Sequence, residues 1–308
     1  MRVSTLMRRV FQGAASAAEP AESARQNLAS PYLPDHLGLA RTQLEAECRR
    51  LCQSTYIGDN LILCRVLGKY LLFADSRDIG IVPHLCLDGF WEAWITQAVT
   101  RVLRPGWRCI DVGANHGYYS LLFADAVGAE GRVLACEPNP EVADLLEKTL
   151  AVNGFSGRTS IVREAIADSD GARQSLIVPP ERSMNAHVRP SAPEGIPLRS
   201  VTLDTLCQSL DRVDLVKIDA EGAEESIWRG MGETIARNPE LTILLEFNVA
   251  RYSAPEAFLA DIQDRGFPLC YVDYDGGVKA VAAARVLTER PNEDWMLWLQ
   301  RPVLGRKE

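Results

Sequence analysis

Apolar residues early in the chain recur first at helical spacing and then in short runs. They predict an amphipathic helix over residues 39–54 and a second helix over 88–103. Between these helices, residues 61–74 form two apolar runs around Gly68 and Lys69, a spacing that is typical of a β-hairpin. The first part of the chain is therefore predicted to contain an N-terminal helix, a hairpin and a second helix.

From residue 105 onward, strand-like runs alternate with helical patterns. This alternation predicts an α/β domain over residues 105–303, with parallel strands, right-handed crossovers and helices on both faces of the sheet. No helix is predicted directly before the final strand, which is therefore expected to insert antiparallel. A helix and hairpin extension over 39–104 and a flexible arm over 1–38 precede this domain. Strands are expected at residues 108–111, 132–136, 160–162, 213–218, 241–247, 268–272 and 295–299, and helices at 118–127, 141–152, 224–236 and 255–265.

Composition narrows the class of protein. Of the 308 residues, 47% are hydrophobic and 24% are charged, so a wholly disordered chain and a fibrous fold are excluded. The net charge of −8 argues against binding nucleic acid through bulk charge. No apolar run reaches the length of a membrane-spanning helix. Peripheral contact with a lipid surface through Arg8 and Arg9 stays open.

The eight cysteines show neither a CxxC motif nor a Cys–His cluster with zinc spacing. We therefore expect free thiols in a reducing compartment, and hence a cytoplasmic protein without a secretory signal. Cys48 and Cys52 lie one helical turn apart, which leaves a metal or redox site there as a minor alternative.

A glycine-rich turn joins the first strand of the α/β domain to the next helix. It reads Asp111-Val-Gly113-Ala-Asn115-His-Gly117. Such glycines let a ligand approach the backbone, and the helix N-terminus favours anionic groups. The spacing lacks the third glycine of a dinucleotide fingerprint, and an acid at the strand end suits a cationic group such as an amine or a sulfonium. A tight strand-to-helix turn is the alternative explanation.

Glu137, Pro138 and Asn139 directly follow the second strand of this domain. An acid at this position can accept hydrogen bonds from both hydroxyls of a ribose. A carboxylate that merely begins a helix is the alternative, because Pro140 suits a first helical turn. Together with the glycine turn, Glu137 indicates a cofactor that contains a nucleoside and lies across the strand tips.

Charged residues cluster at the end of the strand predicted over 213–218. Strand alternation places Lys217 and Asp219 on one face, where buried charges are costly unless paired. Glu221 and Glu224 follow, and the crowding is expected to raise the pKa of at least one carboxylate, as a general base requires. A structural Lys–acid network and metal binding by Asp219 and Glu221 are the alternatives, although no adjacent ligand completes a metal site.

The chain contains four motifs, at residues 111–120, 137–139, 201–204 and 217–224. Together and in this order they resemble the FkbM family of S-adenosylmethionine-dependent methyltransferases, over about residues 75–250. The resemblance implies a class I methyltransferase fold, which is a Rossmann-like seven-stranded sheet with its last strand antiparallel. It also implies transfer of a methyl group to a hydroxyl oxygen of a sugar, a glycolipid or a polyketide-type product.

The resemblance further implies which residues bind the cofactor. The glycine-rich turn would hold the methionine end of the cofactor, and Glu137 would hold its ribose. Glu164 and Ala165 would contact the edge of its adenine. Asp219 and Glu221 would face the methyl group, and Glu92 would be a supporting acid. The full set of expected cofactor residues is Asp111, Gly113, Asn115, Gly117, Tyr118, Glu137, Pro138, Asn139, Glu164, Ala165 and Asp219.

The expected chemistry is proton abstraction without a metal. Glu221 is the expected base, and Asp219 the orienting group, kept ionised by Lys217. Residues 179–197 hold five prolines and are predicted to form a loop or lid. His187 in this stretch is a further candidate proton acceptor, or else a plain surface residue.

The expected partner is a small-molecule, glycan or glycolipid acceptor and not a nucleic acid, and a homo-oligomer is left open. Trp91 is a candidate for stacking against a sugar ring, and His116, where the family more often has an aliphatic residue, is expected to be structural or exposed. Two other functions remain as alternatives. The missing third glycine counts against a Rossmann oxidoreductase that uses NAD, and the intact strand-tip acids count against a non-catalytic binding module.

Overall fold

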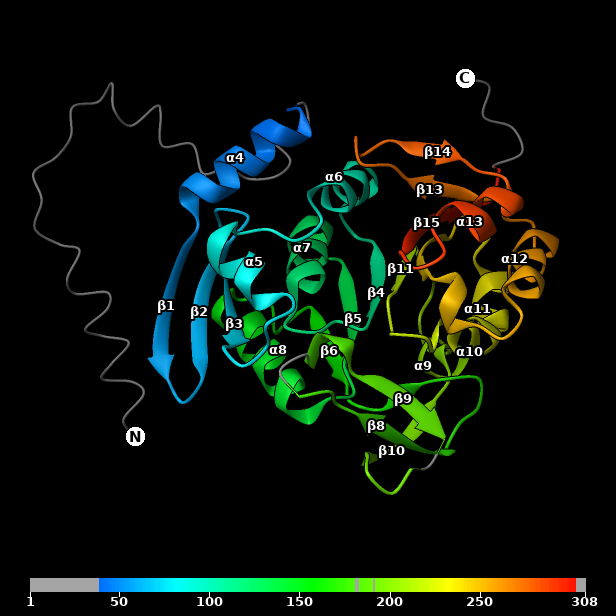
Figure 1. The fold of residues 1–308 in the computed structure, drawn as a ribbon, viewed down its shortest axis with the longest axis horizontal. Coiled ribbons are helices and arrows are strands. Elements are labelled where there is room, and N and C mark those ends of the chain that lie inside the picture. Colours follow the sequence, from blue (N-terminus) through cyan, green and yellow to red (C-terminus); the bar gives the residue numbers. More distant parts are fainter. Residues whose placement is uncertain (1–38, 181–182, 191, 303–308) are drawn as a thin grey trace, which may run out of the picture. The chain divides into compact units, whose positions relative to one another are not determined.

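The computed structural model describes residues 39–180, 183–190 and 192–302. Within them, eight strands form the largest sheet: β4 (Arg108–Val112), β5 (Arg132–Cys136), β6 (Thr159–Val162), β11 (Leu215–Ile218), β12 (Thr242–Phe247), β13 (Cys270–Val272), β14 (Val278–Ala280) and β15 (Trp295–Gln300). Their order is β14-β13-β15-β12-β11-β4-β5-β6 (Figure 1). The strands from β12 to β6 are parallel, and β15 inserts antiparallel to β12. The predicted class I sheet is thus confirmed, with β14 as an additional edge strand.

Helices cover both faces of this sheet because strand residues alternate between two cores. Leu215 packs in one core and Val216 in the other, as their neighbouring positions on β11 require. The first core includes residues of α6 (Ala93–Val102), α7 (Tyr118–Val127) and α8 (Pro140–Val152). The second includes residues of α9 (Leu203–Leu206), α10 (Glu224–Arg229), α11 (Gly232–Arg237), α12 (Pro255–Asp264) and α13 (Ala283–Glu289).

Two parts of this domain differ from the predicted arrangement of helices. The helix expected over 224–236 is broken into α10 and α11, because Gly230 lies so close to another segment that a Cβ there would sit 2.1 Å from the carbonyl oxygen of Ala167. The prediction that no helix precedes the final strand is wrong, since α13 lies between β14 and β15. Its only buried residue is Val286, so the apolar signal in the sequence is weak.

The extension contains more structure than a helix and a hairpin. The first helix, α4 (Arg41–Leu51), ends early, and the following residues form an unpredicted strand, β1 (Gln53–Gly58), whose residues are mostly exposed. The predicted hairpin is confirmed as β2 (Leu61–Val66) and β3 (Tyr70–Asp75), and the three strands form a sheet in the order β1-β2-β3. A short helix, α5 (Val82–Leu87), follows, and α6 begins five residues later than expected.

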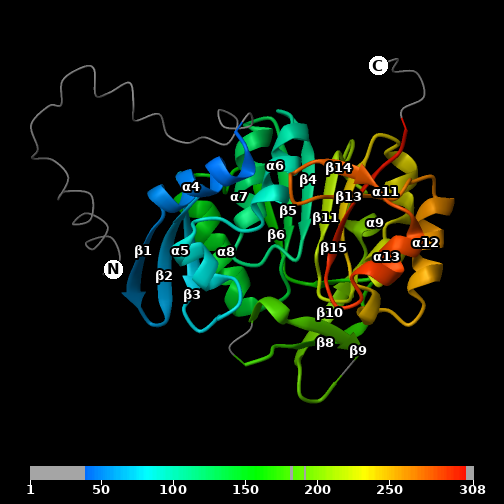
Figure 2. The same cartoon turned by 45° about the horizontal axis from the view of Figure 1, so that its top comes forward.

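The prediction of an irregular loop or lid over residues 179–197 is wrong for part of its length. The stretch contributes a 3₁₀ turn (Ser183–Asn185), β9 (His187–Pro190) and the start of β10 (Ile196–Val201). With β7 (Ala165–Ile166) and β8 (Arg173–Ile177), these strands form a separate sheet in the order β7-β10-β8-β9. Figure 2 shows β8, β9 and β10 of this sheet. We call residues 165–201 the insertion, because they separate β6 from the rest of the main sheet.

Some predictions lie outside the described residues. The arm over 1–38 and the lipid contact through Arg8 and Arg9 are among them. In the described part of the chain, no helix is both long and apolar enough to span a bilayer.

Candidate active site

A pocket opens at the carboxyl ends of β4, β5 and β11, the edge at which open α/β sheets bind ligands. The main sheet contributes the turn after β4, Glu137 and Pro138 after β5, and residues 219–221 after β11. The helices α7, α8 and α10 add Tyr118, Tyr119, Val142 and Ile227, and two further segments supply much of the rest. The extension supplies Ile81, Leu85 and Trp91, and the insertion supplies Ile166, Leu176, Ser183, Met184, Ala186 and Val188.

Glu137 is fixed by two backbone donors. Its Oε2 accepts the N–H of Asn115 and its Oε1 the N–H of Asn139, each at 2.9 Å. Burial raises the pKa of Glu137 to about 7, although the two hydrogen bonds act in the opposite direction. Each carboxylate oxygen keeps a second lone pair, and the side chain borders the pocket. The group therefore fits a role as acceptor for the hydroxyls of a ribose.

The glycines of the turn are explained by close contacts within the protein. Gly113 has a φ of +77°, and a Cβ there would lie 1.7 Å from the carbonyl oxygen of Asp219. Gly117 has a φ of +98°, and a Cβ there would lie 2.7 Å from Leu146 of α8. The tight-turn alternative thus accounts for both glycines, and their role toward a cofactor stays a prediction.

Lys217 and Asp219 form the pair that the strand alternation predicts. The Nζ of Lys217 lies 2.8 Å from Oδ2 of Asp219, and the lysine side chain is only 2% exposed. Burial alone would lower the pKa of Lys217, but the carboxylates of Asp219 and Asp111 outweigh it and raise this pKa above its ordinary value. The ammonium also lies 4.8 Å from the ring centroid of Tyr119. Lys217 therefore stays charged and holds Asp219 in place.

Asp111 is buried behind the turn and does not line the pocket. Its Oδ2 accepts the hydroxyl of Ser120 at 2.6 Å, while its Oδ1 has no hydrogen-bond partner among the described residues. Burial raises the pKa of Asp111, and Lys217 and Ser120 oppose this effect. Asp111 thus acts on the pocket through its charge, which helps to keep Lys217 protonated. Its direct contact with a cofactor stays a prediction.

Glu221 lines the pocket with its backbone in the left-handed region, at a φ of 52°. Glu224 stabilises this loop by accepting the N–H groups of Ala220 and Gly222. Burial raises the pKa of Glu221 to about 7; the charge of Arg251 opposes this, and that of Asp219 adds to it. The expected raised pKa is present, but burial is its main cause and crowding of carboxylates a smaller one.

Arg251 is a site residue that the sequence analysis missed. Its Nη2 lies 2.9 Å from Oε2 of Glu221, and its Nη1 forms an ion pair with Glu246 at the end of β12. Burial raises the pKa of Glu246 well above its ordinary value, and Asp219 adds to this while Arg251 opposes it. One guanidinium thus holds Glu221 from the loop after β11 together with Glu246 from β12, and its Nη2 also lies 3.3 Å from Oδ1 of Asp294.

Asp219, Glu221 and Glu246 place carboxylate oxygens within 4.8 Å of one another, a grouping that could hold a metal ion. The sequence analysis found no third ligand because Glu246 belongs to the neighbouring strand. The Arg251 guanidinium already bonds two of the three carboxylates and supplies positive charge where a cation would supply it. The absence of a metal therefore stays a prediction.

Glu92 supports the site from the extension. Its backbone is also left-handed, at a φ of 41°, and its carboxylate accepts the hydroxyl of Tyr119 at 3.1 Å. Burial, with a contribution from Asp219, raises the pKa of Glu92 to about 7, while Lys217 and the tyrosine hydroxyl lower it. Glu92 itself does not line the pocket, but Tyr119 does.

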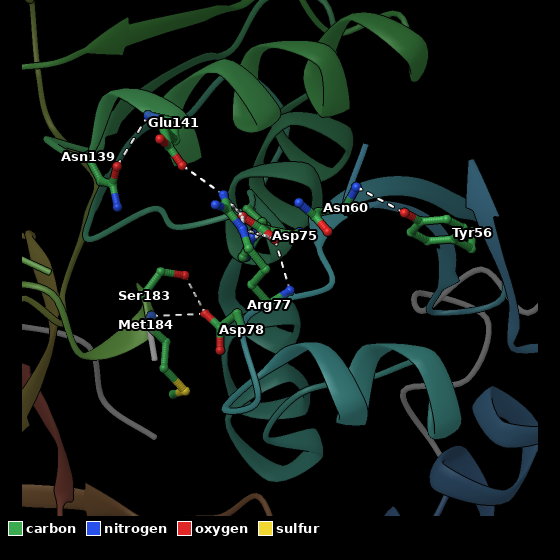
Figure 3. A network of polar contacts seen from close by, with 10 residues as sticks. Tyr56, Asn60, Asp75, Arg77, Asp78, Asn139, Glu141, Ser183 and Met184 are labelled. Atoms are coloured by element: carbon green, nitrogen blue, oxygen red, sulfur yellow. Dashed lines mark hydrogen bonds and ion pairs between the residues drawn. The ribbon is translucent and has the colours of Figure 1, made fainter. Parts of the chain in front are cut away.

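Asp78 connects the extension to the insertion beside the pocket (Figure 3). Its Oδ2 accepts the hydroxyl of Ser183 at 2.6 Å and the N–H of Met184 at 3.0 Å, and its Oδ1 accepts the N–H of Gly80 at 2.7 Å. A Cβ at Gly80 would lie 2.0 Å from the sulfur of Met184, so the methionine packs directly on this backbone. Asp78 therefore fixes one wall of the pocket.

The two histidines near the pocket differ. His116 lines the pocket but is 1% exposed; burial lowers its pKa to about 4, and its Nε2 accepts the N–H of Asp75 at 3.4 Å, so the ring is neutral. His187 lies between two lining residues but does not line the pocket itself. Its Nδ1 lies 3.3 Å from the carbonyl oxygen of Asn185, and its buried Nε2 has no partner among the described residues. Its proposed role as a proton acceptor stays a prediction.

The structure brings most of the predicted site residues to one pocket. Those that line it are Gly113, Asn115, Tyr118, Glu137, Pro138, Lys217, Asp219 and Glu221. Those that do not line it are Asp111, Gly117, Asn139, Glu164, Ala165 and His187. Ile166, rather than Glu164 or Ala165, borders the pocket after β6. Of the tryptophans, Trp91 lines it, as the sequence analysis anticipated.

Comparison with known proteins gives one family match and several similar proteins. Residues 111–269, just over half of the chain, match the Methyltransferase FkbM domain family. The O-methyltransferase TomG from Streptomyces achromogenes, solved in complex with S-adenosylmethionine, aligns with a TM-score of 0.42 at 13% identity, over 74% of this chain and 88% of its own.

Curated relatives match shorter stretches. Methyltransferase sdnD from Sordaria araneosa is 28% identical over 156 residues, which is 40% of this chain and 60% of its own length. Protein-L-isoaspartate O-methyltransferase 1 from Arabidopsis thaliana is 31% identical over 112 residues, 36% of this chain and 45% of its own. This chain spans less than half the length of the isoaspartate methyltransferases that it matches.

The family match covers all four motifs completely, including the turn at 111–117. The cofactor predicted from the sequence, S-adenosylmethionine, agrees with this family. The fold, the pocket at the strand tips and a family match over more than half of the sequence lead to one conclusion: the chain belongs to the family of FkbM methyltransferase domains.

Proposed function

We propose that this chain transfers the methyl group of S-adenosylmethionine to a hydroxyl oxygen of a sugar, a glycolipid or a related natural product. The observation that carries the proposal is that Asp219 and Glu221 line the same pocket as Glu137. The cofactor supplies an already activated methyl group on its sulfonium. The protein must then align the acceptor and remove its proton.

The residues of the pocket divide between these tasks. Glu137 would accept the ribose hydroxyls, and the turn at Asn115 would lie beside it, because its N–H already bonds the same carboxylate. Asp219 is held by Lys217 and would orient the acceptor or the cofactor's charged end. Glu221 would take the proton, since its pKa of about 7 lets it change protonation state near neutral pH.

The lining that comes from outside the main sheet supports an acceptor with an apolar face. Ile81, Leu85, Trp91 and Met184 are apolar, and the neighbouring Ser183 offers a hydroxyl. A sugar ring presents C–H groups on one face and hydroxyls at its rim, and the hydroxyl of a lipid-linked sugar adds apolar surface nearby. Both chemistries suit a wall of this composition.

The test is turnover in Glu221→Gln, which keeps the shape of the side chain and removes the base. We expect turnover to fall by about 100-fold or more, while the affinity for S-adenosylhomocysteine stays within about tenfold. Glu225→Gln is the matched control, because this acid is paired with Arg229 and does not line the pocket, so turnover should stay unchanged. Near-normal turnover in both Glu221→Gln and Asp219→Asn would refute the assignment.

Two further measurements examine the same base. In the wild type, kcat/KM should rise with pH through about 7 and level off above it, because the ionised form of Glu221 is the active one. We expect a chelator to leave activity intact, because the guanidinium of Arg251 already pairs with Glu221 and Glu246. Activity that a chelator removes and magnesium restores would favour a metal at Asp219, Glu221 and Glu246.

A further inference from the structure

Two cysteines of the extension lie in contact. The Sγ atoms of Cys64 in β2 and Cys86 in α5 are 3.5 Å apart. A disulfide needs about 2.0 Å between the sulfurs, so closing the bond requires a shift of about 1.5 Å between two side chains. The two elements already pack against each other, and the backbone carbonyl of Cys86 accepts a hydrogen bond from Cys52 at 3.2 Å. The pair is therefore held near bonding distance.

The two thiols differ in exposure and in acidity. Cys64 is buried, whereas Cys86 is partly exposed. The hydrogen bond between Cys64 and Cys86 lowers the pKa of Cys86 to about 7 against the effect of burial, and the Ser54 side chain contributes in the same direction. The same hydrogen bond, together with burial, raises the pKa of Cys64. Cys86 is thus the accessible thiolate, and Cys64 is its protonated neighbour.

We propose that Cys64 and Cys86 form a redox-active dithiol, which a small-molecule disulfide converts into an intramolecular disulfide. The Cys86 thiolate attacks one sulfur of the small disulfide and expels the other half as a thiolate. The Cys64 thiol then loses its proton to that thiolate and attacks Cys86 Sγ, which releases the second half as a thiolate. Two protein thiols are oxidised, and one small disulfide is reduced to two thiols.

The bond would form beside the proposed active site. Leu85 and Ile81 both line the pocket. Leu85 directly precedes Cys86, and Ile81 directly precedes the first residue of α5. The disulfide would tie this helix to β2. The proposal does not depend on methyl transfer, because the state of the thiols can be read directly in the absence of any substrate.

The test uses the full chain incubated with oxidised glutathione, acid-quenched and blocked with N-ethylmaleimide. Digestion with trypsin and Asp-N separates the three cysteines, because Cys52 falls in residues 51–58, Cys64 in 59–65 and Cys86 in 78–87. We expect a linked pair of peptides 59–65 and 78–87 that reduced glutathione separates again. A link between 51–58 and 78–87, or no link at all, would overturn the proposal.

Two controls identify the attacking thiol. In Cys64→Ser, Cys86 should stop at the mixed disulfide and carry one glutathione, because the resolving thiol is gone. In the reduced wild type, Cys86 should react with iodoacetamide at pH 7 at least about tenfold faster than Cys270, which is also partly buried but whose pKa burial raises. Equal alkylation rates for Cys86 and Cys270, or unmodified Cys86 in Cys64→Ser, would contradict the assignment of Cys86 as the nucleophile.

Discussion

Replacing Glu137 by glutamine tests the electrostatics of the proposed nucleoside end of the pocket. The carboxylate is 8% exposed, and burial raises its pKa from 4.5 to about 7. Between these two values the folded protein holds a proton on this group that the unfolded chain has released. Glu137 should therefore raise the free energy of unfolding of the wild type below pH 4.5. This stabilising contribution should be lost as the pH rises through 7.

The magnitude follows from the two pKa values. A change from 4.5 to about 7 corresponds to about 3 kcal/mol of stability lost across this range. Glutamine has no such titration, but its NH₂ group faces one of the two backbone donors, from Asn115 or Asn139, at a cost of about 1–3 kcal/mol. Glu137→Gln should thus be less stable than the wild type near pH 5, and equally or more stable near pH 8.

The assay is denaturant unfolding of both proteins at pH values from 5 to 8. Glu147→Gln is the matched control, because this acid lies on α8 with its side chain 68% exposed and pairs with Arg163 at the surface. The difference in the free energy of unfolding between Glu147→Gln and the wild type should be constant with pH. A constant difference for Glu137→Gln as well would refute the argument that burial of Glu137 governs its protonation.

Three further predictions concern positions around the pocket. Lys217→Met removes the buried ammonium that neutralises the half-buried Asp219 and the buried Asp111, and should lower the free energy of unfolding by about 3–5 kcal/mol in denaturant titrations. Gly113→Ala should cost roughly 2–6 kcal/mol, because its Cβ meets a carbonyl oxygen, whereas Gly154→Ala, with the same φ of +77° but open space, should cost only about 1–2 kcal/mol. Asp78→Ala removes the hydrogen bonds that fix one wall of the pocket, and should raise the KM for the acceptor severalfold. Calorimetry should show an affinity for S-adenosylhomocysteine within about tenfold of the wild type. An equal loss of both affinities would show that this wall also holds the cofactor.

Elements with a clear apolar pattern could be predicted closely from the sequence. The strand expected over 132–136 is β5 to the residue, because its buried positions make a short apolar run between polar neighbours. The start of α8 follows from Asn139, whose side chain accepts the N–H of Glu141, and from Pro140 in the first turn. In both places the local sequence alone determines the element.

The insertion could not be predicted in this way. β9 is half-exposed or exposed at every position, and β10 has a single buried residue, Ser200, so neither strand shows an apolar alternation. The prolines at 190 and 197 also argue against strands by composition. Pro190 stands at the end of β9, which is an edge strand, where a missing N–H costs little. Pairing with β8 and β10, and not local preference, makes these residues strands.

The missed acid of the site shows how sheet register carries information that spacing does not. Lys217 pairs with Leu244 and Ile218 with Leu245 across the parallel strands β11 and β12. One residue further, Asp219 is level with Glu246, so the two carboxylates meet although they lie far apart in the sequence. Once β11 and β12 are taken as neighbours, their ends must coincide, and a second acid beside Asp219 follows from the register. A partner such as Arg251 is then required by charge, because several buried carboxylates with Lys217 as their sole cation would not remain ionised together.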